Sequence, residues 1–378
     1  MPAVSHVLVV GAGVAGCAVA ILLAEGGVRV DLVERKTEVT AVGSGITLMG
    51  NALRVLKQVG VWDKVEAAGF SFGTTGLRAP GPGAALIAEI PDAHTGGADL
   101  PATLGMPRPA LARILVERAE SLGVRVQFGS TLDSIEEHEG IVTASFVDGR
   151  HEDYDLVIGA DGVNSRLREL IGIDVKPEPT GMAIWRVFTP RPAQIDHTDL
   201  YYGGASYIAG YCPTGEDSLY AYIVEDANAS NVELSGPERV ARMVELSRSY
   251  SGPWDDIRPL ITEDRGVNYT NFESHVVDGA WNRGRAVLIG DAAHSCPPTL
   301  AQGAAQSLED AAVLAELLLA ANAVDEELWA DFTRRRLERA KAIVVASVQL
   351  VTWLLEHKTD ADVPGLMGGI SAMVSVPA

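Results

Sequence analysis

Three glycines near the N-terminus, Gly11, Gly13 and Gly16, have a spacing that can bind the pyrophosphate of a dinucleotide. In such a turn the first glycine permits the tight bend, the second lets the anion approach the backbone, and the third allows close packing of a helix on a strand. The N–H groups at the start of that helix then point toward the anion. By itself the triplet could also be an ordinary tight turn, so its meaning depends on the neighbouring elements.

The residues on either side of the glycines supply a strand, a helix and a second strand. Apolar residues 6–10 predict a strand before the turn, and apolar residues 17–24 predict a helix after it. A strand over residues 28–33 ends at Glu34, about 20 residues on, where a carboxylate would bind a ribose hydroxyl. Arg35 could favour a phosphate or be a solvated surface residue. We therefore expect a dinucleotide site.

Two later segments each carry a glycine and an aspartate at the end of a predicted buried strand. Residues 155–160 lead to Asp161-Gly162, and residues 285–289 lead to Gly290-Asp291. A helix is expected directly after the first segment and, following a loop, from about Gly303 after the second. The nucleotide-binding part of the chain is therefore expected to return near the C-terminal end.

The three motifs together resemble the single-component (class A) FAD-dependent aromatic monooxygenases, the group of para-hydroxybenzoate, salicylate and 6-hydroxynicotinate hydroxylases. The match includes Gly290-Asp291 with His294, Pro298, Gln302-Gly303 and Glu309-Asp310, and it extends over nearly the whole chain. The resemblance implies that NADH or NADPH, as a transient co-substrate, reduces bound FAD. A flavin C4a-hydroperoxide formed with O₂ would then hydroxylate a small aromatic or heteroaromatic substrate.

The resemblance also assigns residues to the cofactor. The glycine turn and Glu34 would bind the ADP half of FAD, and Arg108 would reach its phosphates and ribityl chain. Asp291 would bind a ribityl hydroxyl or a nearby water, and Asp161 would serve both FAD and the nicotinamide. The full expected set is Gly11, Gly13, Ala15, Gly16, Glu34, Arg35, Gly45, Arg108, Asp161, Asp291, Gln302, Gly303 and Ala304.

The loop after Asp291 also favours an anionic reduced flavin on physical grounds. Pro297 and Pro298 stiffen the chain beside the expected ring, and the helix that begins near Gln302 points its positive end at the pyrimidine edge. Preorganised positive potential of this kind stabilises developing negative charge. His294 is expected to be structural rather than an acid or a base.

The candidates for contact with the substrate or for catalysis are Pro298, Thr47, Tyr211 and Arg186. Thr47 lies in the glycine-rich segment 41–48, where some relatives have a histidine base, and a threonine hydroxyl cannot act as a base near neutral pH. Tyr211 lies about where those relatives carry a pocket tyrosine. Arg186 could neutralise an anionic substrate, flank the flavin or pair with a structural acid. Asn51 is expected to cap a helix.

Composition restricts the class of the chain and its partners. With 378 residues, 47% of them hydrophobic and 21% charged, the chain should be globular with two domains. The net charge of -20 argues against nucleic acid or an anionic membrane as a partner. Three distant cysteines suggest a reducing, cytoplasmic compartment and no metal site. The apolar run 343–355 is too short to span a membrane, and we expect a monomer or homodimer.

We expect an α/β fold: a Rossmann-like FAD-binding domain with an inserted mixed β-sheet substrate domain and a long C-terminal helix. The FAD-binding domain would comprise residues 1–70, 98–176 and 278–325, the substrate domain residues 71–97 and 177–277, and the C-terminal helix and tail residues 326–378.

Local patterns add four expectations. One amphipathic helix should cover residues 51–68, and the tail 364–378 should pack loosely. The arginines of the run 334–336 should lie on a solvated face. Six of the nine tyrosines fall within residues 201–222, which is either ordinary strand composition or an aromatic wall over a ligand pocket.

Other functions are compatible with parts of this pattern. An FAD-dependent reductase or oxidase of the same fold would not insert oxygen. A plain NAD-dependent dehydrogenase would leave the Gly290-Asp291 segment unexplained. A non-enzymatic FAD-bound protein is the third alternative, and the threonine in place of a histidine is mild support for it.

Overall fold

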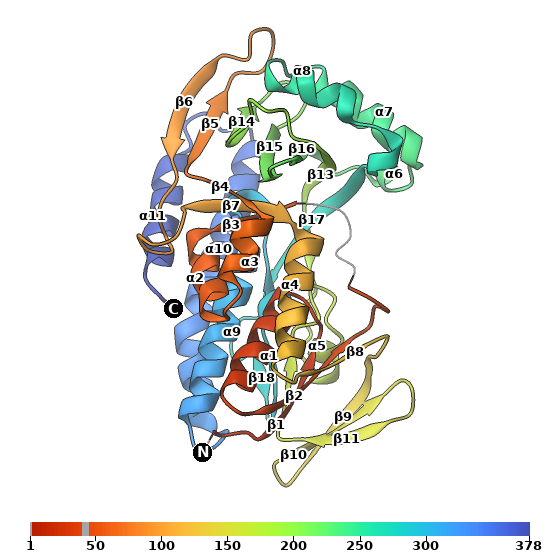
Figure 1. The fold of residues 1–378 in the computed structure, drawn as a ribbon, viewed down its shortest axis with the longest axis vertical. Helices are drawn as coiled ribbons and strands as arrows, with labels where there is room; N and C mark the ends of the chain where they lie inside the picture. Colours follow the sequence, from red (N-terminus) through yellow and green to blue (C-terminus); the bar gives the residue numbers. More distant parts are fainter. Residues whose placement is uncertain (1, 40–44) are drawn as a thin grey trace.

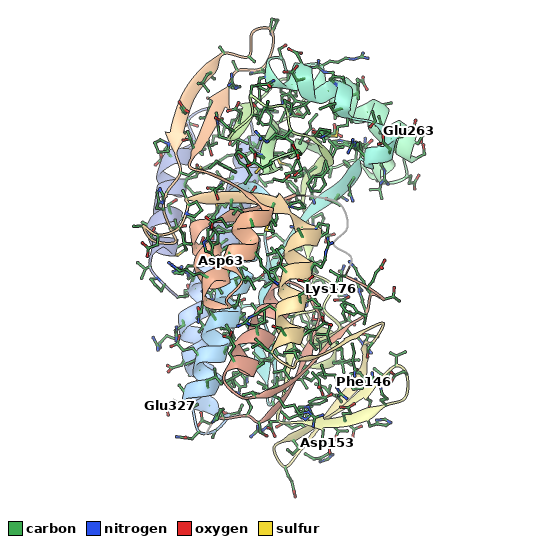
Figure 2. All side chains as sticks on the ribbon, viewed as in Figure 1. Asp63, Phe146, Asp153, Lys176, Glu263 and Glu327 are labelled. Atoms are coloured by element: carbon green, nitrogen blue, oxygen red, sulfur yellow. The ribbon has the colours of Figure 1, made fainter. Side chains whose placement is uncertain are left out.

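The computed structural model describes residues 2–39 and 45–378, in which four β-sheets pack with helices (Figure 1). A six-stranded sheet lies in one half of the molecule and an eight-stranded sheet in the other, and side chains fill the space between the elements (Figure 2). The long helix α10 (Glu326–Leu355) runs beside both halves. Residues 41–44 of the glycine-rich segment lie outside the described residues.

The six-stranded sheet has the order β18-β19-β12-β1-β2-β8. Its strands are β1 (His6–Val10), β2 (Arg29–Glu34), β8 (Arg125–Phe128), β12 (Leu156–Gly159), β18 (Asn282–Arg283) and β19 (Ala286–Leu288). Neighbouring strands are parallel except for the pair of β18 and β19. Parallel strands are buried on both faces, which is why residues 7–10 are all apolar and at most 5% exposed.

Three helices pack around this sheet and give it the α/β character that the sequence predicts. They are α1 (Val14–Glu25), α4 (Arg108–Ser121) and α9 (Gly303–Ala320). Helix α1 contacts both α4 and α9.

The eight-stranded sheet has the order β20-β17-β13-β16-β15-β14-β5-β6. Its strands are β5 (Thr74–Arg78), β6 (Leu86–Pro91), β13 (Glu178–Pro190), β14 (Thr198–Tyr202), β15 (Ile208–Gly215), β16 (Ser218–Asp226), β17 (Asn268–Val276) and β20 (His294–Ser295). Strands β14 and β5 are parallel and the other neighbours are antiparallel, so the sheet is mixed, as predicted.

The two faces of this large sheet have different neighbours. On one face, Trp185 and Tyr211 belong to a buried cluster completed by α7 (Gly236–Ser247) and α8 (Pro253–Ile257). On the other face, Ile184 and Val224 pack against Val351 of α10. We call the face that carries Ile184 the inner face, because it is turned toward α10 and away from α7 and α8.

Two small sheets and the remaining helices complete the fold. The first small sheet consists of β3 (Gly45–Met49), β7 (Thr103–Pro107) and β4 (Phe70–Phe72), and the second of β9 (Leu132–His138), β10 (Ile141–Phe146) and β11 (His151–Tyr154). The other α-helices are α2 (Gly50–Gln58), α3 (Trp62–Ala68), α5 (Arg166–Leu170), α6 (Ala229–Val232) and α11 (Val363–Ser375). In residues 2–39 and 45–378, none of the helices has the length and hydropathy needed to cross a bilayer.

The predicted fold class is confirmed, and two local predictions are wrong. The helix expected over residues 51–68 is two helices, α2 and α3, because Gly60 adopts a left-handed φ of 72° that a continuous helix does not allow. The tail forms α11, in which only Val374 is buried, so the expected loose packing is not contradicted. Arg336, expected on a solvated face, is fully buried.

Candidate active site

The turn between β1 and α1 uses each of its three glycines for a different reason. Gly11 has a φ of +103°, and a Cβ there would lie 2.4 Å from the carbonyl oxygen of Ala160. A Cβ on Gly16 would lie 1.9 Å from the carbonyl oxygen of Gly11, so only glycine lets the helix approach the turn. A Cβ on Gly13 would meet no described atom within 4 Å. Gly13 therefore borders open space.

The start of α1 is suited to bind an anion. Its N-cap is Gly13, which has no side chain to cap the helix, and its first turn contains no acidic residue. The first N–H groups and the positive end of the helix dipole are therefore directed at a site that a phosphate can occupy. Glu34 ends β2 beside this turn, and its carboxylate accepts a 3.0 Å hydrogen bond from the N–H of Ala12. Arg35, the next residue, is exposed.

The Gly290-Asp291 segment lies against the glycine turn. Gly290 has a φ of +60°, and a Cβ there would lie 3.1 Å from the Cβ of Ala15 and 2.8 Å from the Oγ of Ser307. Since Ala15 belongs to α1 and Ser307 to α9, the two helices and the segment converge at this point. The structure thus brings together the first and the last sequence motif.

Asp291 and Arg108 come from distant segments and act on each other electrostatically. Both residues keep solvent-accessible surface, and the protein atoms near the Asp291 carboxyl raise its pKa above the ordinary value. The positive charge of Arg108 at the start of α4 acts in the opposite direction. Arg108 also acts electrostatically on Arg186 and Tyr220, although burial has the largest effect on the pKa of each. Arg108 therefore connects the predicted cofactor residues with the inner face of the large sheet.

The N-terminus of α9 is open in the same way as that of α1. Its N-cap is Gln302, its first turn contains no acidic residue, and a Cβ on Gly303 would meet no described atom within 4 Å. The partly buried Ala304 follows, and Pro298 is exposed in the preceding loop. The positive end of an 18-residue helix can therefore stabilise an anion placed there.

These residues fit FAD. The open Gly13 and the uncapped α1 suit the pyrophosphate, Glu34 suits the ribose, and the open start of α9 suits the end of the cofactor that becomes negative on reduction. The sequence alone could not show that Gly13 and Gly303, at the starts of α1 and α9, both border open space.

Asp161 has a structural function that the sequence did not reveal. Its carboxylate accepts hydrogen bonds from the backbone N–H of Arg166 at 2.7 Å and of Leu167 at 3.0 Å, and from the hydroxyl of Ser165 at 2.5 Å. These are the first residues of α5 and its N-cap, so Asp161 fixes the start of that helix. Its predicted contact with FAD or the nicotinamide stays a prediction.

Arg186 projects from β13 on the inner face with aromatic residues beside it. Its Nη2 donates a 2.7 Å hydrogen bond to the hydroxyl of Thr270, and burial lowers its pKa. Its Cα partner on β16 is Tyr222, while Phe188 pairs with Tyr220, so all four side chains share the inner face. The rings of Tyr220 and Tyr222 lie 5.2 Å apart and those of Phe188 and Tyr220 lie 6.3 Å apart.

Tyr220 and Tyr222 lie side by side on the inner face, and whether they form an aromatic wall over a ligand stays a prediction. Burial raises the pKa of both phenols, and both side chains keep part of their surface accessible. Neither residue was among the predicted site residues. What identifies them is that Tyr222 pairs with Arg186 and that Tyr220 lies two residues away on the same face. This can be recognised only when the register between β13 and β16 is known.

Thr47 lies on β3, which packs on the inner face next to these tyrosines. Its hydroxyl donates a hydrogen bond to the sulfur of Cys212 at 3.6 Å. A Cβ on Gly45 would lie 2.7 Å from the Cβ of Tyr220, so glycine at this position allows β3 to approach β16. Thr47, Cys212 and Tyr220 therefore form one cluster, and Cys212 is a further residue that sequence reasoning missed.

Tyr211 lies outside the cluster formed by Thr47, Cys212 and Tyr220. It is 1% exposed on the opposite face of the sheet, where its hydroxyl donates to the carboxylate of Asp199. The register explains the difference, because Tyr211 pairs with Ala221 and Ala221 pairs with Val187, the neighbour of Arg186. Adjacent residues of a strand point to opposite faces, so Arg186 and Tyr211 cannot both face the site. This corrects the expectation that Tyr211 contacts the substrate.

Two other polar residues have structural partners. His294 is buried with its Nε2 at 2.7 Å from a carboxylate oxygen of Asp310, in agreement with the structural role expected for it. Asn51 does not cap α2, whose N-cap is Met49. Its side-chain amide instead donates to Gln302 at 3.0 Å and to Glu309 at 3.1 Å, so the side chain of Gln302 is also engaged.

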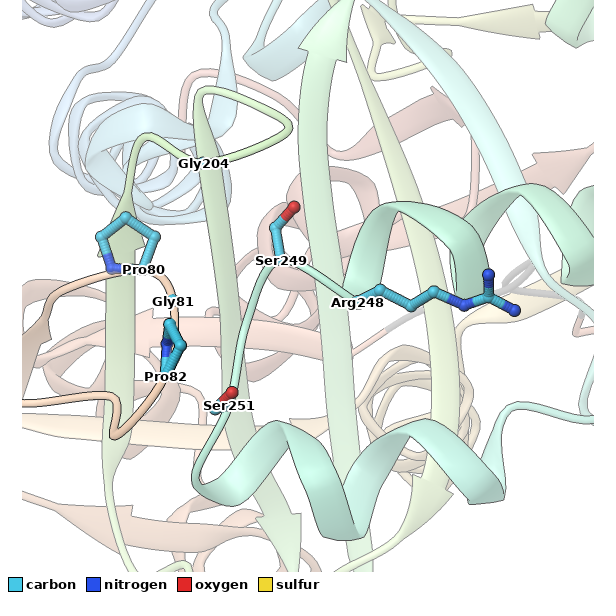
Figure 3. A pocket seen from close by; sticks show the side chains of 7 residues that line it. All are labelled: Pro80, Gly81, Pro82, Gly204, Arg248, Ser249 and Ser251. Atoms are coloured by element: carbon cyan, nitrogen blue, oxygen red, sulfur yellow. The ribbon is translucent and has the colours of Figure 1, made fainter.

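A surface pocket lies apart from all of these residues. It has a volume of about 440 Å³ and lies between the loop after β5 and the segment that joins α7 to α8 (Figure 3). It is lined by Pro80, Gly81, Pro82, Gly204, Arg248, Ser249 and Ser251. None of these belongs to the motifs, so the pocket is not the candidate active site. Over the described residues, no three His, Cys, Asp or Glu side chains are grouped as metal ligands.

Comparison with known proteins gives a consistent result. Residues 4–347 match a protein family described as FAD binding domain. The chain is 31% identical to 6-hydroxynicotinate 3-monooxygenase of Pseudomonas fluorescens over 89% of each chain. It is 31% identical to 3-amino-4-hydroxybenzoate 2-monooxygenase of Streptomyces cremeus over 89% of this chain and 84% of that protein. The solved structure of 2-methyl-3-hydroxypyridine-5-carboxylic acid oxygenase in a tetrameric form superposes with a TM-score of 0.80 and 26% identity, over 96% of this chain and 95% of that one.

Proposed function

This chain belongs to the class A FAD-dependent aromatic monooxygenases, and on that premise we propose that it hydroxylates a small aromatic or heteroaromatic ring, with NADH or NADPH as transient reductant. The similar proteins named above are oxygenases of hydroxylated pyridine or benzene carboxylic acids, by their names. Bound FAD supplies the redox chemistry, accepting electrons from the nicotinamide and activating O₂. The protein supplies binding, orientation and electrostatics.

One observation carries the proposal: strand β20, which begins three residues after Asp291, pairs with β17 of the large sheet, and β17 pairs with β13, the strand of Arg186. The cofactor segment is therefore directly connected to the sheet that carries the aromatic inner face, which supports a substrate site between them. The rings of Tyr220 and Tyr222 can stack with a planar substrate. The guanidinium of Arg186 can neutralise a carboxylate on that substrate or flank the flavin.

The residues of the inner face can hold hydrogen bonds to a substrate without an ionised base. Thr47 offers a hydroxyl, and burial raises the pKa of the Cys212 thiol to about 11, so the thiol stays protonated at neutral pH. We therefore propose that the substrate ring is activated by its own hydroxyl or amino substituent. Pro298 would border the ring of the flavin, as the resemblance implies.

Purified protein tests the proposal directly. We expect a yellow protein whose NADH or NADPH oxidation accelerates with hydroxylated benzoates or hydroxypyridines and yields a hydroxylated product containing oxygen from ¹⁸O₂. Acceleration without oxygen incorporation, with hydrogen peroxide as the product, would favour the alternative, a reductase or oxidase of the same fold. If no member of a broad aromatic panel changes the rate, the proposed function is wrong.

We further propose that the chain works in the cytoplasm as a monomer or homodimer. Three cysteines without disulfides, Cys17, Cys212 and Cys296, support a reducing compartment. The division into a cofactor domain and a substrate domain with the boundaries expected above is likewise a proposal. Light scattering after size exclusion measures the oligomeric state, and a tetramer would contradict it.

A further inference from the structure

Arg336 is the most deeply buried charged residue of the run 334–336. Its side chain is 0% exposed, whereas that of Arg334 is 70% exposed and that of Arg335 is 21% exposed. A buried guanidinium is stable only if its donors are satisfied, because removing the charge from water is costly. The contacts of Arg336 therefore show which residues depend on it.

The guanidinium of Arg336 binds three side chains of α9, Gln306, Glu309 and Asp310, whose spacing of three and four residues places them on one face of the helix. Its Nε donates to Asp310 at 2.7 Å and its Nη1 donates to Glu309 at 3.0 Å. Its Nη2 donates to the side chain of Gln306 at 2.8 Å and to the backbone carbonyl of the same residue at 3.3 Å. The planar fork of an arginine matches this arrangement, and a lysine could not replace it with equal geometry.

The first branch of this network ends at the Gly290-Asp291 segment. The carboxylate oxygen of Asp310 that faces away from Arg336 accepts a 2.8 Å hydrogen bond from the N–H of Gly290. The same oxygen lies 2.7 Å from Nε2 of His294. Asp310 thus fixes the left-handed turn that immediately precedes Asp291.

The second branch ends at the start of α9. Gln306 donates to the side chain of Gln302 at 3.3 Å, and Asn51 donates to the same oxygen at 3.0 Å and to Glu309 at 3.1 Å. Gln302 is the N-cap residue that precedes the open Gly303. One buried arginine is therefore connected to both segments that fit the flavin half of FAD.

We propose that Arg336 is a positioning residue for FAD, which aligns the Gly290-Asp291 turn and the N-terminus of α9 with each other. This inference rests on FAD binding and not on the identity of the substrate. Arg336 itself would not touch the cofactor. It acts through Asp310 on one side and through Gln306 and Glu309 on the other.

The test compares Arg336→Lys with Arg334→Lys, a matched change two residues away whose exposed arginine is bonded to Asp331 of its own helix. We expect Arg336→Lys to weaken FAD binding to the apoprotein at least tenfold and to shift the midpoint potential of the bound flavin. Arg334→Lys should leave both unchanged. The rise in melting temperature caused by a fixed FAD concentration should shrink in Arg336→Lys alone.

A milder variant keeps the proposal testable if Arg336→Lys does not fold. Gln306→Met removes the branch toward Gln302 and one side-chain acceptor of Arg336, while the backbone carbonyl of residue 306 can still accept from the guanidinium. It should weaken FAD binding and lower the melting temperature of the apoprotein less than Arg336→Lys does. If either variant folds and binds FAD within twofold of the parent with an unchanged potential, Arg336 is structural only and the proposal is wrong. Because these measurements use no substrate, they do not depend on whether the proposed hydroxylation is correct.

Discussion

Thr47 and Cys212 are joined by a hydrogen bond in which the threonine hydroxyl donates to the sulfur across 3.6 Å. The contact attaches β3 to the inner face of the large sheet, next to Tyr220. Both partners are uncharged near neutral pH, since burial raises the pKa of the thiol to about 11. The pair can therefore orient a substrate group by hydrogen bonding and leave its ionisation to the substrate.

Replacing Thr47 by Ala is expected to alter substrate affinity more than flavin content. Loss of one hydrogen bond corresponds to about 1 kcal/mol, or roughly a fivefold rise in KM. Thr47→Ser keeps the hydroxyl and is the control. Steady-state kinetics with the best substrate, together with the ratio of flavin to protein absorbance, measures both quantities. Unchanged kinetics in Thr47→Ala would remove this residue from the site.

Gly13 and Gly16 should respond differently to the same added methyl group. Gly13→Ala meets open space, so the apoprotein should keep its melting temperature while FAD affinity falls at least tenfold. Gly16→Ala places a Cβ 1.9 Å from a carbonyl oxygen and should lower stability by roughly 2 kcal/mol or more. Thermal unfolding with and without FAD distinguishes the two effects. Equal loss of stability in both variants would contradict the open space at Gly13.

Asp291 should favour FAD binding at the expense of apoprotein stability. Because burial raises its pKa, the folded apoprotein binds this proton more tightly than the unfolded chain, so stability falls as pH rises through the folded-state pKa. At neutral pH, Asp291→Asn should therefore slightly raise the melting temperature of the apoprotein. Asp291→Ala should yield largely FAD-free protein. Full flavin occupancy in Asp291→Ala would refute its role.

Tyr211 and Tyr222 provide a comparison between the two faces of the large sheet. Tyr211→Phe leaves the buried carboxylate of Asp199 without one donor and should cost about 1–3 kcal/mol of stability, with KM unchanged. Tyr222→Phe should change KM or the coupling of NAD(P)H oxidation to hydroxylation, with little loss of stability. Urea unfolding and product analysis measure these effects. If KM changed in Tyr211→Phe and not in Tyr222→Phe, the substrate would bind on the face opposite to the inner face, and the proposed site would be wrong.

The sequence predicted the cofactor segments better than the substrate face. The glycine turn, Glu34 and the Gly290-Asp291 segment are local motifs, and their residues lie at strand ends that apolar runs predict. The inner face depends on which residue of β15 pairs with which residue of β16, and pairing register is not a local property. For that reason the sequence predicted both Arg186 and Tyr211 as site residues, although only one of them can lie on the inner face.

The burial of Arg336 could not be predicted either, because it also depends on contacts between segments far apart in the sequence. Three consecutive arginines on a helix suggest a solvated face, and the acidic residues near them in the sequence, such as Asp331, are not the partners of Arg336. Those partners, Glu309 and Asp310, lie on a different helix and are buried only after α9 and α10 pack together. Burial of a charged residue can be predicted only when its partners are known.

Strand β12 lies between β1 and β19, although the whole of β13 to β17 separates β12 from β19 along the chain. While the chain is being synthesised, β12 therefore has one unpaired edge until residues 286–288 leave the ribosome. Such an unpaired edge is a place where another chain can pair. The inserted sheet thus delays completion of the cofactor-binding sheet until most of the chain has been made.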